Sequence, residues 1–328
     1  MSVRDLLIIG AGPAGLAVGI AASEARLDYQ VLEKGVLVNS IFNFPPGMTF
    51  FTTPDLLEIG KLPFVTPYEK PTRHEALRYY RRVVDAYQIP IAFGEEVLGI
   101  TADTVDGEQI FIVDCRSDTG VRRAHKSRAV VFAIGYYDQP NRLGIDGEDL
   151  PHVQHYYGDP HAHYRQNVLV VGGKNSAAIA SLELYRAGAN VTLVHRGATL
   201  SDRIKYWIRP DIDNRIKEGS VIAHFESRVV EIRPTSAVVE LKGGEQLEIP
   251  ADRVLLLTGY HPDFALLEGA GVQLGPRREP VFDPETMQTN VPGLFVAGGL
   301  VGGLDTGAIF IENGRFHGEK IVRAIRKT

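Results

Sequence analysis

Short hydrophobic runs alternate with glycine-rich turns and alanine-rich segments along this chain. The first run, residues 5–10, is apolar and strand-sized, and it leads through residues 11–15 into a segment with helical character. Residues 29–33 form the next apolar run, and it ends on the acid Glu33, 18 residues after Gly15. This order predicts a strand, a tight turn, a helix and a second strand, which together make a βαβ unit.

The same pattern returns farther along the chain. Residues 167–171 and 191–194 are predicted strands, and residues 172–177 form the turn between them. Three landmarks shift by the same 162 residues: Gly10, Gly15 and Glu33 correspond to Gly172, Ala177 and His195. A shared offset at three separate positions is a stronger signal than one glycine motif, so we expect an internal repeat.

Each glycine turn has the composition of a dinucleotide-binding site. Small residues let the backbone approach a pyrophosphate, and the helix that follows offers free N–H groups and the positive end of its dipole. Lys174 stands at the position of Gly12, where its side chain either crowds or neutralises phosphates. The sequence therefore predicts an α/β protein with two Rossmann-like, three-layer dinucleotide-binding domains.

The residue that ends each second strand distinguishes the two predicted nucleotides. Glu33 can accept hydrogen bonds from both hydroxyls of an adenosine ribose and would repel a 2′-phosphate. The second copy has His195 and Arg196 there, and a guanidinium has the donor geometry to bind a phosphate. The second site is thus predicted to bind NADP(H). Arg203 and Lys205 extend this basic pocket or belong to a solvated loop.

Bulk composition narrows the class of protein. A length of 328 residues favours two domains, and a formal net charge of -5 argues against a nucleic-acid partner. The apolar runs fall well short of the roughly 20 residues that cross a bilayer, and no signal peptide is evident, so we expect a cytoplasmic protein without a membrane segment. Cys115 is the one cysteine, which excludes a CxxC redox pair.

A set of motifs extends over nearly the whole chain. It comprises GAGPAG at 10–15 with Glu33, Ala-Ile-Gly at 133–135, Thr-Gly at 258–259 and PGLFVAG at 292–298. In these the sequence resembles the thioredoxin-reductase-like branch of the pyridine-nucleotide disulfide oxidoreductase superfamily. The resemblance implies a split FAD domain, residues 1–140 and 262–328, with an NADPH domain inserted at residues 141–261. It also implies a homo-oligomer, namely a dimer.

Further segments narrow the resemblance to the YpdA-type bacillithiol disulfide reductases, which use FAD and NADPH. They are residues 39–45, 48–53, 57–60, 70–73, 206–210 and 309–318. Two positions depart from the pattern. Ala14 stands where members implicated in thiol chemistry have cysteine, and Gly299 replaces the aspartate that holds the ribityl chain in the wider superfamily. Asp305 is a candidate to supply that carboxylate.

The motifs and the resemblance together assign residues to the two cofactors. The predicted FAD contacts are Gly10, Gly12, Pro13, Ala14, Gly15, Glu33, Lys34, Asn39, Thr52, Val97, Ala133, Gly135, Gly298, Gly299 and Ile309. The predicted NADP(H) contacts are Gly172, Gly173, Lys174, Asn175, Ser176, Ala177, His195, Arg196, Arg203 and Gly259. No catalytic residue is assigned, and no metal site is expected.

Local patterns give further expectations about structure. Thr72 and Glu75 have the spacing of a capping box at the start of a helix that packs on the FAD domain. The pair Phe50–Phe51 is expected in the core, rather than beside the flavin or a substrate. Residues 306–325 are predicted to become helical and, by the resemblance, to point their N-terminus at the flavin.

Two other groups of residues have chemistry that we interpret as structural. His152, His155, His161 and His163 precede the second repeat, and the last two have the spacing of a metal pair on a strand. Because no cluster of carboxylates or cysteines accompanies them, they are interpreted as linker histidines. Cys115 falls in an alternating strand, where we expect a buried residue without a histidine beside it to lower the thiol pKa.

The sequence thus predicts an NADPH-dependent flavin oxidoreductase. The resemblance implies a small-molecule disulfide, bacillithiol disulfide first, as the electron acceptor. Alternatives are a quinone or ferredoxin reductase, a flavin monooxygenase, and a non-catalytic NADPH-sensing flavoprotein. The monooxygenase fingerprint needs histidine at position 162 after Tyr156 and Gly158, and the chain has Ala162.

Overall fold

The structure is a computed structural model that describes residues 3–105 and 107–327. Its contacts divide the chain into two compact units. Unit 1 comprises Met1–Asn43, Gly47–Gln139 and Tyr260–Thr328, and unit 2 comprises Phe44–Pro46 and Pro140–Gly259. The chain passes between the units near two short strands, β7 (Gln139–Pro140) and β16 (Tyr260–His261).

Unit 1 is built on a mixed sheet in the order β3-β2-β1-β6-β5-β4, with β17 also pairing with β6. The strands are β1 (Arg4–Ile9), β2 (Tyr29–Glu33), β3 (Ile91–Phe93), β4 (Glu95–Val105), β5 (Glu108–Ser117), β6 (Arg122–Phe132) and β17 (Leu294–Val296). The predicted strands at residues 5–10 and 29–33 are confirmed, and they pair in parallel through β1 and β2.

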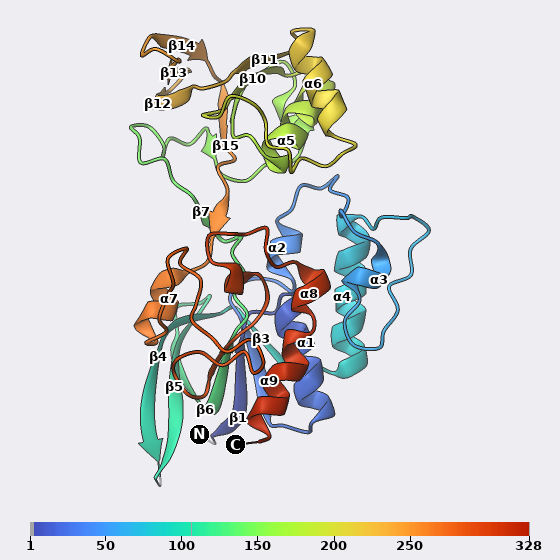
Figure 1. Ribbon diagram of the computed structural model, residues 1–328, viewed down its shortest axis with the longest axis vertical. Coiled ribbons are helices and arrows are strands. Elements are labelled where there is room, and N and C mark those ends of the chain that lie inside the picture. Colours follow the sequence, from blue (N-terminus) through green and yellow to red (C-terminus); the bar gives the residue numbers. More distant parts are fainter. Residues whose placement is uncertain (1–2, 106, 328) are drawn as a thin grey trace. The chain divides into compact units, whose positions relative to one another are not determined.

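Strand β6 joins the parallel and antiparallel halves of this sheet (Figure 1). Its first half pairs with β5 in an antiparallel hairpin, as in the partners Cys115 and Arg123. Its second half pairs in parallel with β17, as in Phe132 and Val296. The C-terminal part of the chain therefore completes a sheet that the N-terminal part begins.

The helices of unit 1 are α1 (Pro13–Glu24), α2 (Asn39–Phe42), α3 (Pro54–Leu57), α4 (Arg73–Tyr87), α7 (Phe264–Gly269), α8 (Ile311–Gly314) and α9 (His317–Ile325), with the 3₁₀ helix η2 (Gly298–Gly302). Helices α1 and α9 lie side by side (Figure 1). A Cβ atom at Gly318 would lie 2.6 Å from the carbonyl oxygen of Ala17, so the glycine permits this close packing.

The predicted capping box of α4 is confirmed. The hydroxyl of Thr72 accepts from the Glu75 amide, and the Glu75 carboxylate accepts from the Thr72 amide at 2.9 Å. One face of the helix buries Tyr79 and Tyr80, and the hydroxyl of Tyr80 donates to the carbonyl oxygen of Leu57 at 3.0 Å. The Tyr80 ring is buried and its hydroxyl is hydrogen-bonded, so α4 anchors the segment that carries α3.

Unit 2 repeats the parallel half of unit 1. Its five-stranded sheet has the order β11-β10-β9-β15-β8, and a separate antiparallel sheet has the order β12-β13-β14. The strands are β8 (Val153–Gln154), β9 (Asn167–Val171), β10 (Asn190–Val194), β11 (Val221–His224), β12 (Arg228–Arg233), β13 (Ser236–Glu240), β14 (Gln246–Pro250) and β15 (Arg253–Leu256). The helices are η1 (Pro160–His163), α5 (Asn175–Arg186) and α6 (Arg209–Lys217).

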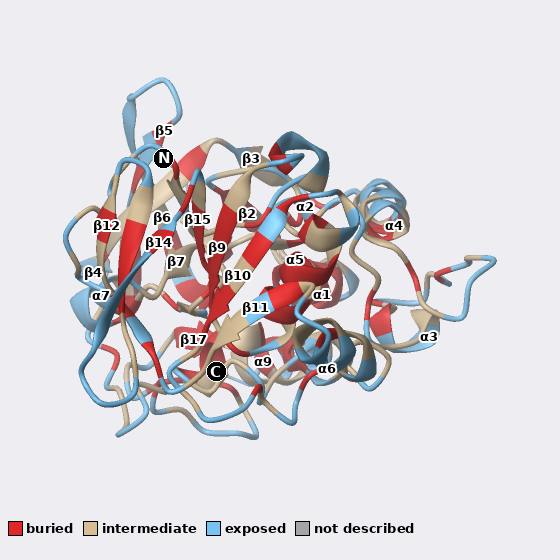
Figure 2. Ribbon diagram, turned by 90° about the horizontal axis from the view of Figure 1, so that it is seen from above, coloured by how far each residue is buried: buried red, intermediate tan, exposed pale blue. Residues whose placement is uncertain are grey.

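The central strands β1 and β9 are buried beyond their first one or two residues, as expected for parallel strands covered on two faces. Figure 2 shows this burial for β9. Strand β9 and helix α5 of unit 2 correspond to β1 and α1 of unit 1. The predicted mixed α/β fold is confirmed, and the repeat found in the sequence is present in the structure as two copies of one β-turn-α-β arrangement.

One local prediction was wrong in part: Phe50 is buried as expected, but Phe51 is exposed, with Lys70 over its ring. His161 and His163, interpreted as linker histidines, lie in η1, where Pro160 and the Asp159 side chain start a 3₁₀ turn. The C-terminal segment becomes helical at Ile311, and residues 315–316 separate α8 from α9.

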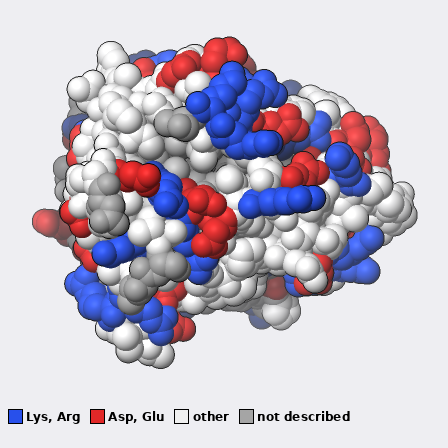
Figure 3. All heavy atoms as spheres, turned by 90° about the horizontal axis from the view of Figure 1, so that it is seen from below, with Lys and Arg blue, Asp and Glu red and all other residues white. Residues whose placement is uncertain are grey.

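Among the helices that the structure describes, none is long and apolar enough to cross a membrane. Lysine and arginine side chains lie interspersed with aspartate and glutamate side chains on the face in Figure 3, and neither sign covers that face. This mixture agrees with the net charge of -5 and offers no extended basic surface there.

Candidate functional site

The first glycine turn follows β1 and opens α1. Gly10 has a φ of +104°, and a Cβ atom there would lie 2.5 Å from the carbonyl oxygen of Ala133. A Cβ atom at Gly15 would collide with the carbonyl oxygen of Gly10. Both positions therefore require glycine, because any side chain would push the turn away from the strand and the helix.

The N-terminus of α1 is open at this turn. A Cβ atom at Gly12 would meet nothing within 4 Å, so the backbone of the N-cap residue is open to a ligand. Pro13 occupies the first helical position, which costs no hydrogen bond because its missing N–H would have been unpaired. An accessible helix N-terminus of this kind suits the pyrophosphate of a dinucleotide.

The Glu33 carboxylate closes the turn from the end of β2. One oxygen accepts a hydrogen bond from the Ala11 amide at 2.7 Å, and the other accepts one from the Gly35 amide at 2.7 Å. The side chain is buried, and this burial raises its pKa, against the lowering effect of the two amide hydrogen bonds. Each carboxylate oxygen has a second lone pair, so Glu33 can still accept from a ribose hydroxyl.

A pocket in unit 1 opens beside Glu33 at the carboxyl ends of β1, β2 and β6. This is the edge at which open α/β sheets bind ligands. Five of the predicted FAD residues line it: Gly10, Glu33, Lys34, Val97 and Gly135. Lys34 forms a 2.9 Å salt bridge with Asp138 across its rim.

Several residues that line this pocket were not predicted from the sequence. They are Glu95, Glu96, Tyr136, Asp138, His261, Asp263 and Leu266. Tyr136 and Asp138 directly follow the Ala-Ile-Gly motif that ends at Gly135, so their place in the sequence was a usable signal. Glu95 and His261 come from the start of β4 and from β16, and no sequence motif marks them.

Other predicted FAD residues gather near the start of α1. A Cβ atom at Gly298 would lie 2.6 Å from the Cβ atom of Ala14, and one at Gly299 would lie 3.7 Å from the carbonyl oxygen of Ile309. The amide of Gly298 donates to Nδ1 of His317 at 3.1 Å. Close packing thus brings Ala14, Gly298, Gly299 and Ile309 into one region of unit 1.

Two further predicted FAD residues, Asn39 and Thr52, are also absent from the lining of the unit 1 pocket. Asn39 begins α2, and its side chain accepts from the Val36 amide at 3.4 Å, so it stabilises the loop after β2. Thr52 is half-buried just before α3. Asp305, the candidate replacement for the missing aspartate, accepts from the Gly307 amide and lies 3.8 Å from Arg277.

The second glycine turn in unit 2 has the geometry of the first. Gly172 has a φ of +155°, and a Cβ atom there would lie 2.6 Å from the carbonyl oxygen of Leu257 and 2.9 Å from Ala177. The exposed Lys174 is the N-cap of α5, at the position that corresponds to Gly12. Asn175 tethers the following loop, because its amide group donates to the Arg203 carbonyl and accepts from the Lys205 amide.

His195 follows β10, as Glu33 follows β2. A Cβ atom at Gly173 would collide with the His195 ring, so the glycine allows the imidazole to pack over the turn. Burial and the neighbouring Arg196 lower the pKa of His195, which favours the neutral ring. Arg196 is exposed and takes part in no salt bridge among residues 3–105 and 107–327, so its guanidinium is available to an anion.

The remaining predicted NADP(H) residues occupy the same edge of the unit 2 sheet. Ser176 is exposed in the first turn of α5, and Gly259 follows the carboxyl end of β15. A separate hollow in unit 2, between Thr199 and Phe225, contains none of the predicted residues.

The environment of Cys115 corrects one expectation. The thiol is buried in β5 as predicted, but a histidine lies beside it: the sulfur of Cys115 and a ring nitrogen of His125 are within 4.8 Å. This neighbour does not activate the thiol, since burial, then Glu95, raises the pKa of Cys115 to about 12. Sequence reasoning missed His125 because it lies on another strand, and strand register decides the contact.

Two Rossmann-type sheets, each with a glycine turn at the carboxyl end of its first strand, are the architecture of a protein that binds two dinucleotides. The chain belongs to the pyridine nucleotide-disulphide oxidoreductase family, whose sequence model matches residues 7–298. This confirms the family resemblance and the enzyme class predicted from the sequence.

Similar proteins narrow this class. Bacilliredoxin reductase Bdr of Bacillus subtilis (strain 168) is 40% identical over 328 residues, which are 100% of this chain and 99% of that protein. The structure of bacillithiol disulfide reductase Bdr (YpdA) from Bacillus cereus has a TM-score of 0.95 and 38% identity, covering 99% of both chains. The Staphylococcus aureus protein of the same name has a TM-score of 0.92 and 36% identity, covering 100% of this chain and 99% of that chain. The predicted YpdA-type resemblance is confirmed.

Proposed function

We propose that the protein is an NADPH-dependent FAD oxidoreductase that reduces a low-molecular-weight disulfide, bacillithiol disulfide first. One observation supports the proposal: the two glycine turns occupy the same place in a strand-turn-helix-strand arrangement, but the residues at the end of the second strand have opposite chemistry. Glu33 presents a carboxylate in unit 1, whereas His195 and Arg196 present an imidazole and a guanidinium in unit 2. A carboxylate suits a free ribose, and a guanidinium suits a ribose 2′-phosphate.

Unit 1 is the proposed FAD site. The open backbone at Gly12 and the N-terminus of α1 would hold the pyrophosphate, and Glu33 would accept from the adenosine ribose. Gly135 and Val97 would line the adenosine end. Ala14, Gly298, Gly299 and Ile309 would lie along the rest of the cofactor, where the missing side chains of the two glycines would let the backbone approach it.

Unit 2 is the proposed NADPH site. Gly172 and Gly173 keep the turn close to the sheet, and the α5 N-terminus would face the pyrophosphate. Lys174 would add a positive charge beside it. Arg196 would bind the 2′-phosphate, and the neutral His195 ring would pack against the adenosine.

The bound flavin would supply the redox chemistry that the side chains lack, by accepting a hydride from NADPH and passing two electrons on. The net reaction consumes NADPH, one proton and a disulfide, and it yields NADP⁺ and two thiols. Support for this acceptor comes from the bacillithiol disulfide reductases named above. With Ala14 at the helix start and the Cys115 thiol buried, the chain offers no internal dithiol, so electrons pass to the substrate without one.

Stopped-flow mixing under anaerobic conditions tests the proposal. NADPH should bleach the flavin of the purified protein rapidly, and bacillithiol disulfide should then restore the colour within the turnover time. Oxidised glutathione, a quinone and oxygen serve as comparison acceptors. Reoxidation by a quinone alone would favour a quinone reductase, and NADPH-dependent oxygen consumption with substrate hydroxylation would favour a monooxygenase. Flavin that NADPH does not reduce would overturn the oxidoreductase and favour an NADPH sensor.

We also propose that the protein is a homodimer, as the resemblance implies. Light scattering of the purified protein at two concentrations tests this assembly state, because a monomer would scatter as one 36.0 kDa chain.

A further inference from the structure

The hairpin β4-β5-β6 of unit 1 brings three different metal-binding side chains to one face. Cys115 pairs with Val97 on β4 and with Arg123 on β6, and residues directly opposite in an antiparallel pair share a face. Every second residue along a strand returns to that face, which places Glu95 and His125 there as well. Strand β4 has a β-bulge between Val97 and Gly99. A bulge changes the direction in which the neighbouring side chains point.

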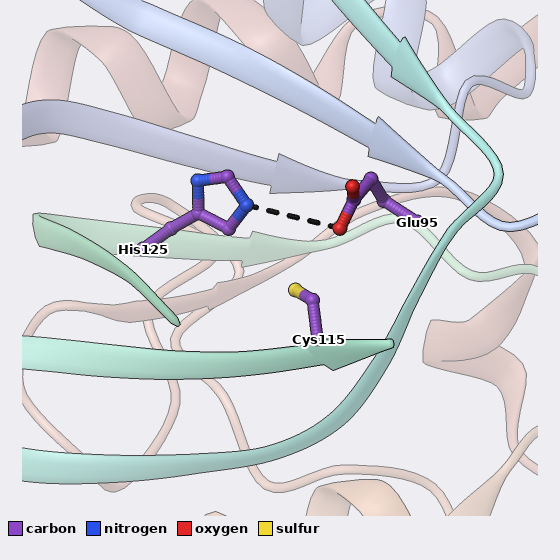
Figure 4. Close-up of side chains that lie close together, drawn as sticks. All are labelled: Glu95, Cys115 and His125. Carbon is purple, nitrogen blue, oxygen red and sulfur yellow. Dashed lines mark ion pairs between the residues drawn. The ribbon is translucent and has the colours of Figure 1, made fainter. Parts of the chain in front are cut away.

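The three side chains converge in the structure (Figure 4). One donor atom from each, a carboxylate oxygen of Glu95, the sulfur of Cys115 and a ring nitrogen of His125, lies within 4.8 Å of the other two. Glu95 Oε2 and His125 Nε2 are 3.9 Å apart, which is too long for a hydrogen bond. The Glu95 side chain is 3% exposed, and Cys115 is fully buried.

Among residues 3–105 and 107–327, two buried atoms of this cluster find no hydrogen-bond partner: Glu95 Oε2 and His125 Nε2. A buried polar atom without a partner costs about 1–3 kcal/mol, more when it carries charge, so native proteins seldom leave two facing each other. One group that satisfies both at once is a cation between them, because a carboxylate oxygen and an unprotonated imidazole nitrogen are both metal ligands.

We propose that Glu95, Cys115 and His125 form a binding site for a divalent transition metal, with zinc as the metal that the donor set fits best. Oxygen, nitrogen and sulfur ligands in one cluster suit Zn²⁺, and the thiol excludes Mg²⁺ and Ca²⁺, which take oxygen ligands. Tetrahedral zinc with bonds of about 2.0–2.3 Å sets its ligand atoms roughly 3.3–3.8 Å apart. The 3.9 Å between Glu95 and His125 is close to this spacing, and the sulfur must approach by less than about 1.5 Å.

The carboxylate of Glu95 is held in place through the oxygen that would not bind the metal. Glu95 Oε1 pairs with the guanidinium of Arg123, which leaves Oε2 for the metal. Outer contacts of this kind fix the direction of a ligating carboxylate. Metal binding would displace the thiol proton of Cys115 to solvent and leave a thiolate on zinc, and a water molecule would complete the four ligands. The site would tie three strands together beside the pocket that Glu95 also lines.

Metal content and cobalt substitution test the site in the full-length protein. Protein stripped with EDTA is titrated with Zn²⁺ alone, and binding is followed by metal analysis after gel filtration and by thermal unfolding. Co²⁺ then serves as a spectroscopic probe, since a tetrahedral site absorbs at longer wavelengths than oxidised flavin. The variants are His125→Gln and Cys115→Ser, with Lys126→Gln as the matched control. Lys126 is the next residue on β6, and its side chain points to the opposite face.

We expect one zinc per chain in the wild type and in Lys126→Gln, with a melting temperature that rises with zinc concentration. His125→Gln should lower zinc affinity at least about 100-fold and lose the cobalt bands. Cys115→Ser should lose the thiolate-to-cobalt charge-transfer band. The proposal is overturned if the wild type binds no zinc at micromolar concentration, or if His125→Gln binds zinc as tightly as Lys126→Gln. If Cys115→Ser does not fold, the wild-type cobalt spectrum alone decides whether sulfur is a ligand.

Discussion

The backbone amide of Gly298 donates a hydrogen bond of 3.1 Å to Nδ1 of His317, at the point where η2 follows β17. This bond requires Nδ1 to be unprotonated. Burial, then the charge of Lys320, lowers the pKa of His317 to about 4, so the ring is neutral near pH 7. The same contact therefore makes the region around Gly298 sensitive to acid.

Stability should fall as the pH drops from about 6.5 to about 4 because the unfolded chain binds a proton at His317 that the folded chain rejects. Neutral His317 contributes its full stabilisation at pH values above the pKa that the side chain has in the unfolded chain. The difference between that pKa and the value of about 4 in the folded protein corresponds to roughly 3 kcal/mol. His317→Asn should flatten this part of the pH profile in urea unfolding at pH 7 and pH 4.5. His161→Asn, an exposed histidine, is the control. Parallel profiles for wild type and His317→Asn would refute the assignment.

Glu33→Arg should yield largely colourless protein. The substitution removes the acceptor for the Ala11 and Gly35 amides and puts a cation at the proposed ribose contact. Glu33→Gln should retain flavin more weakly, by about 10- to 100-fold in affinity, since one charged hydrogen bond contributes about 1.5–3 kcal/mol. The flavin-to-protein absorbance ratio measures both. Glu24→Gln, a half-exposed acid on α1, should stay yellow, and full retention in Glu33→Arg would contradict the site.

Arg196→Ala should reduce the preference for NADPH over NADH about 10- to 100-fold, through loss of a charge-assisted contact to the 2′-phosphate. The comparison of kcat/KM for the two nucleotides measures this preference. Arg228→Ala on β12, where Arg228 pairs with Glu240, should leave it unchanged. A wild-type enzyme equally efficient with NADH would show that His195 and Arg196 do not select the phosphate.

Ala14→Cys places a thiol at the N-terminus of α1, where the helix dipole lowers a thiol pKa. The missing side chain of Gly298 leaves space beside it. If a protein thiol assists disulfide reduction, kcat with bacillithiol disulfide should rise in Ala14→Cys and not in Ala14→Ser. Equal turnover in wild type and both variants would show that no thiol is needed at this position.

Cys115 should resist alkylation by iodoacetamide in the native protein at pH 8 and react fully in guanidinium chloride. The sulfur is buried, and a pKa of about 12 leaves almost no thiolate. Mass spectrometry of the labelled chain measures the fraction modified. Rapid native labelling would mean that β5 opens easily or that the thiol is ionised.

The sequence predicted the parts of the fold that depend on local pattern. The strands that end just before Gly10 and Gly172, the turns that follow them and the capping box at Thr72 all depend on residues near one another in the chain. Steric limits at a glycine turn are local, so composition and spacing reveal them. The 162-residue repeat added long-range information, since it showed two copies of one unit.

The alignment of strands that are paired in the sheet could not be predicted from local sequence in the same way. The contact between Cys115 and His125 depends on how β5 aligns with β6, and a shift by one residue would move His125 to the other face. The break between α8 and α9 likewise has no proline to mark it, since Phe316 and Arg315 are both compatible with a helix. His261 reached the unit 1 pocket from a strand that sequence alone assigned to the other domain.

Unit 1 is formed by segments from both ends of the chain, so it cannot finish folding until the ribosome has synthesised the C-terminal segment. Residues 140–259 are continuous and can fold as soon as they emerge, whereas β6 must wait for β17 and α1 must wait for α9. Until then the newly made chain exposes one edge of β6 and one apolar side of α1. Nascent chains should therefore depend most on chaperones between synthesis of β6 and β17, and loss of the C-terminal helix should harm the unit that was synthesised first.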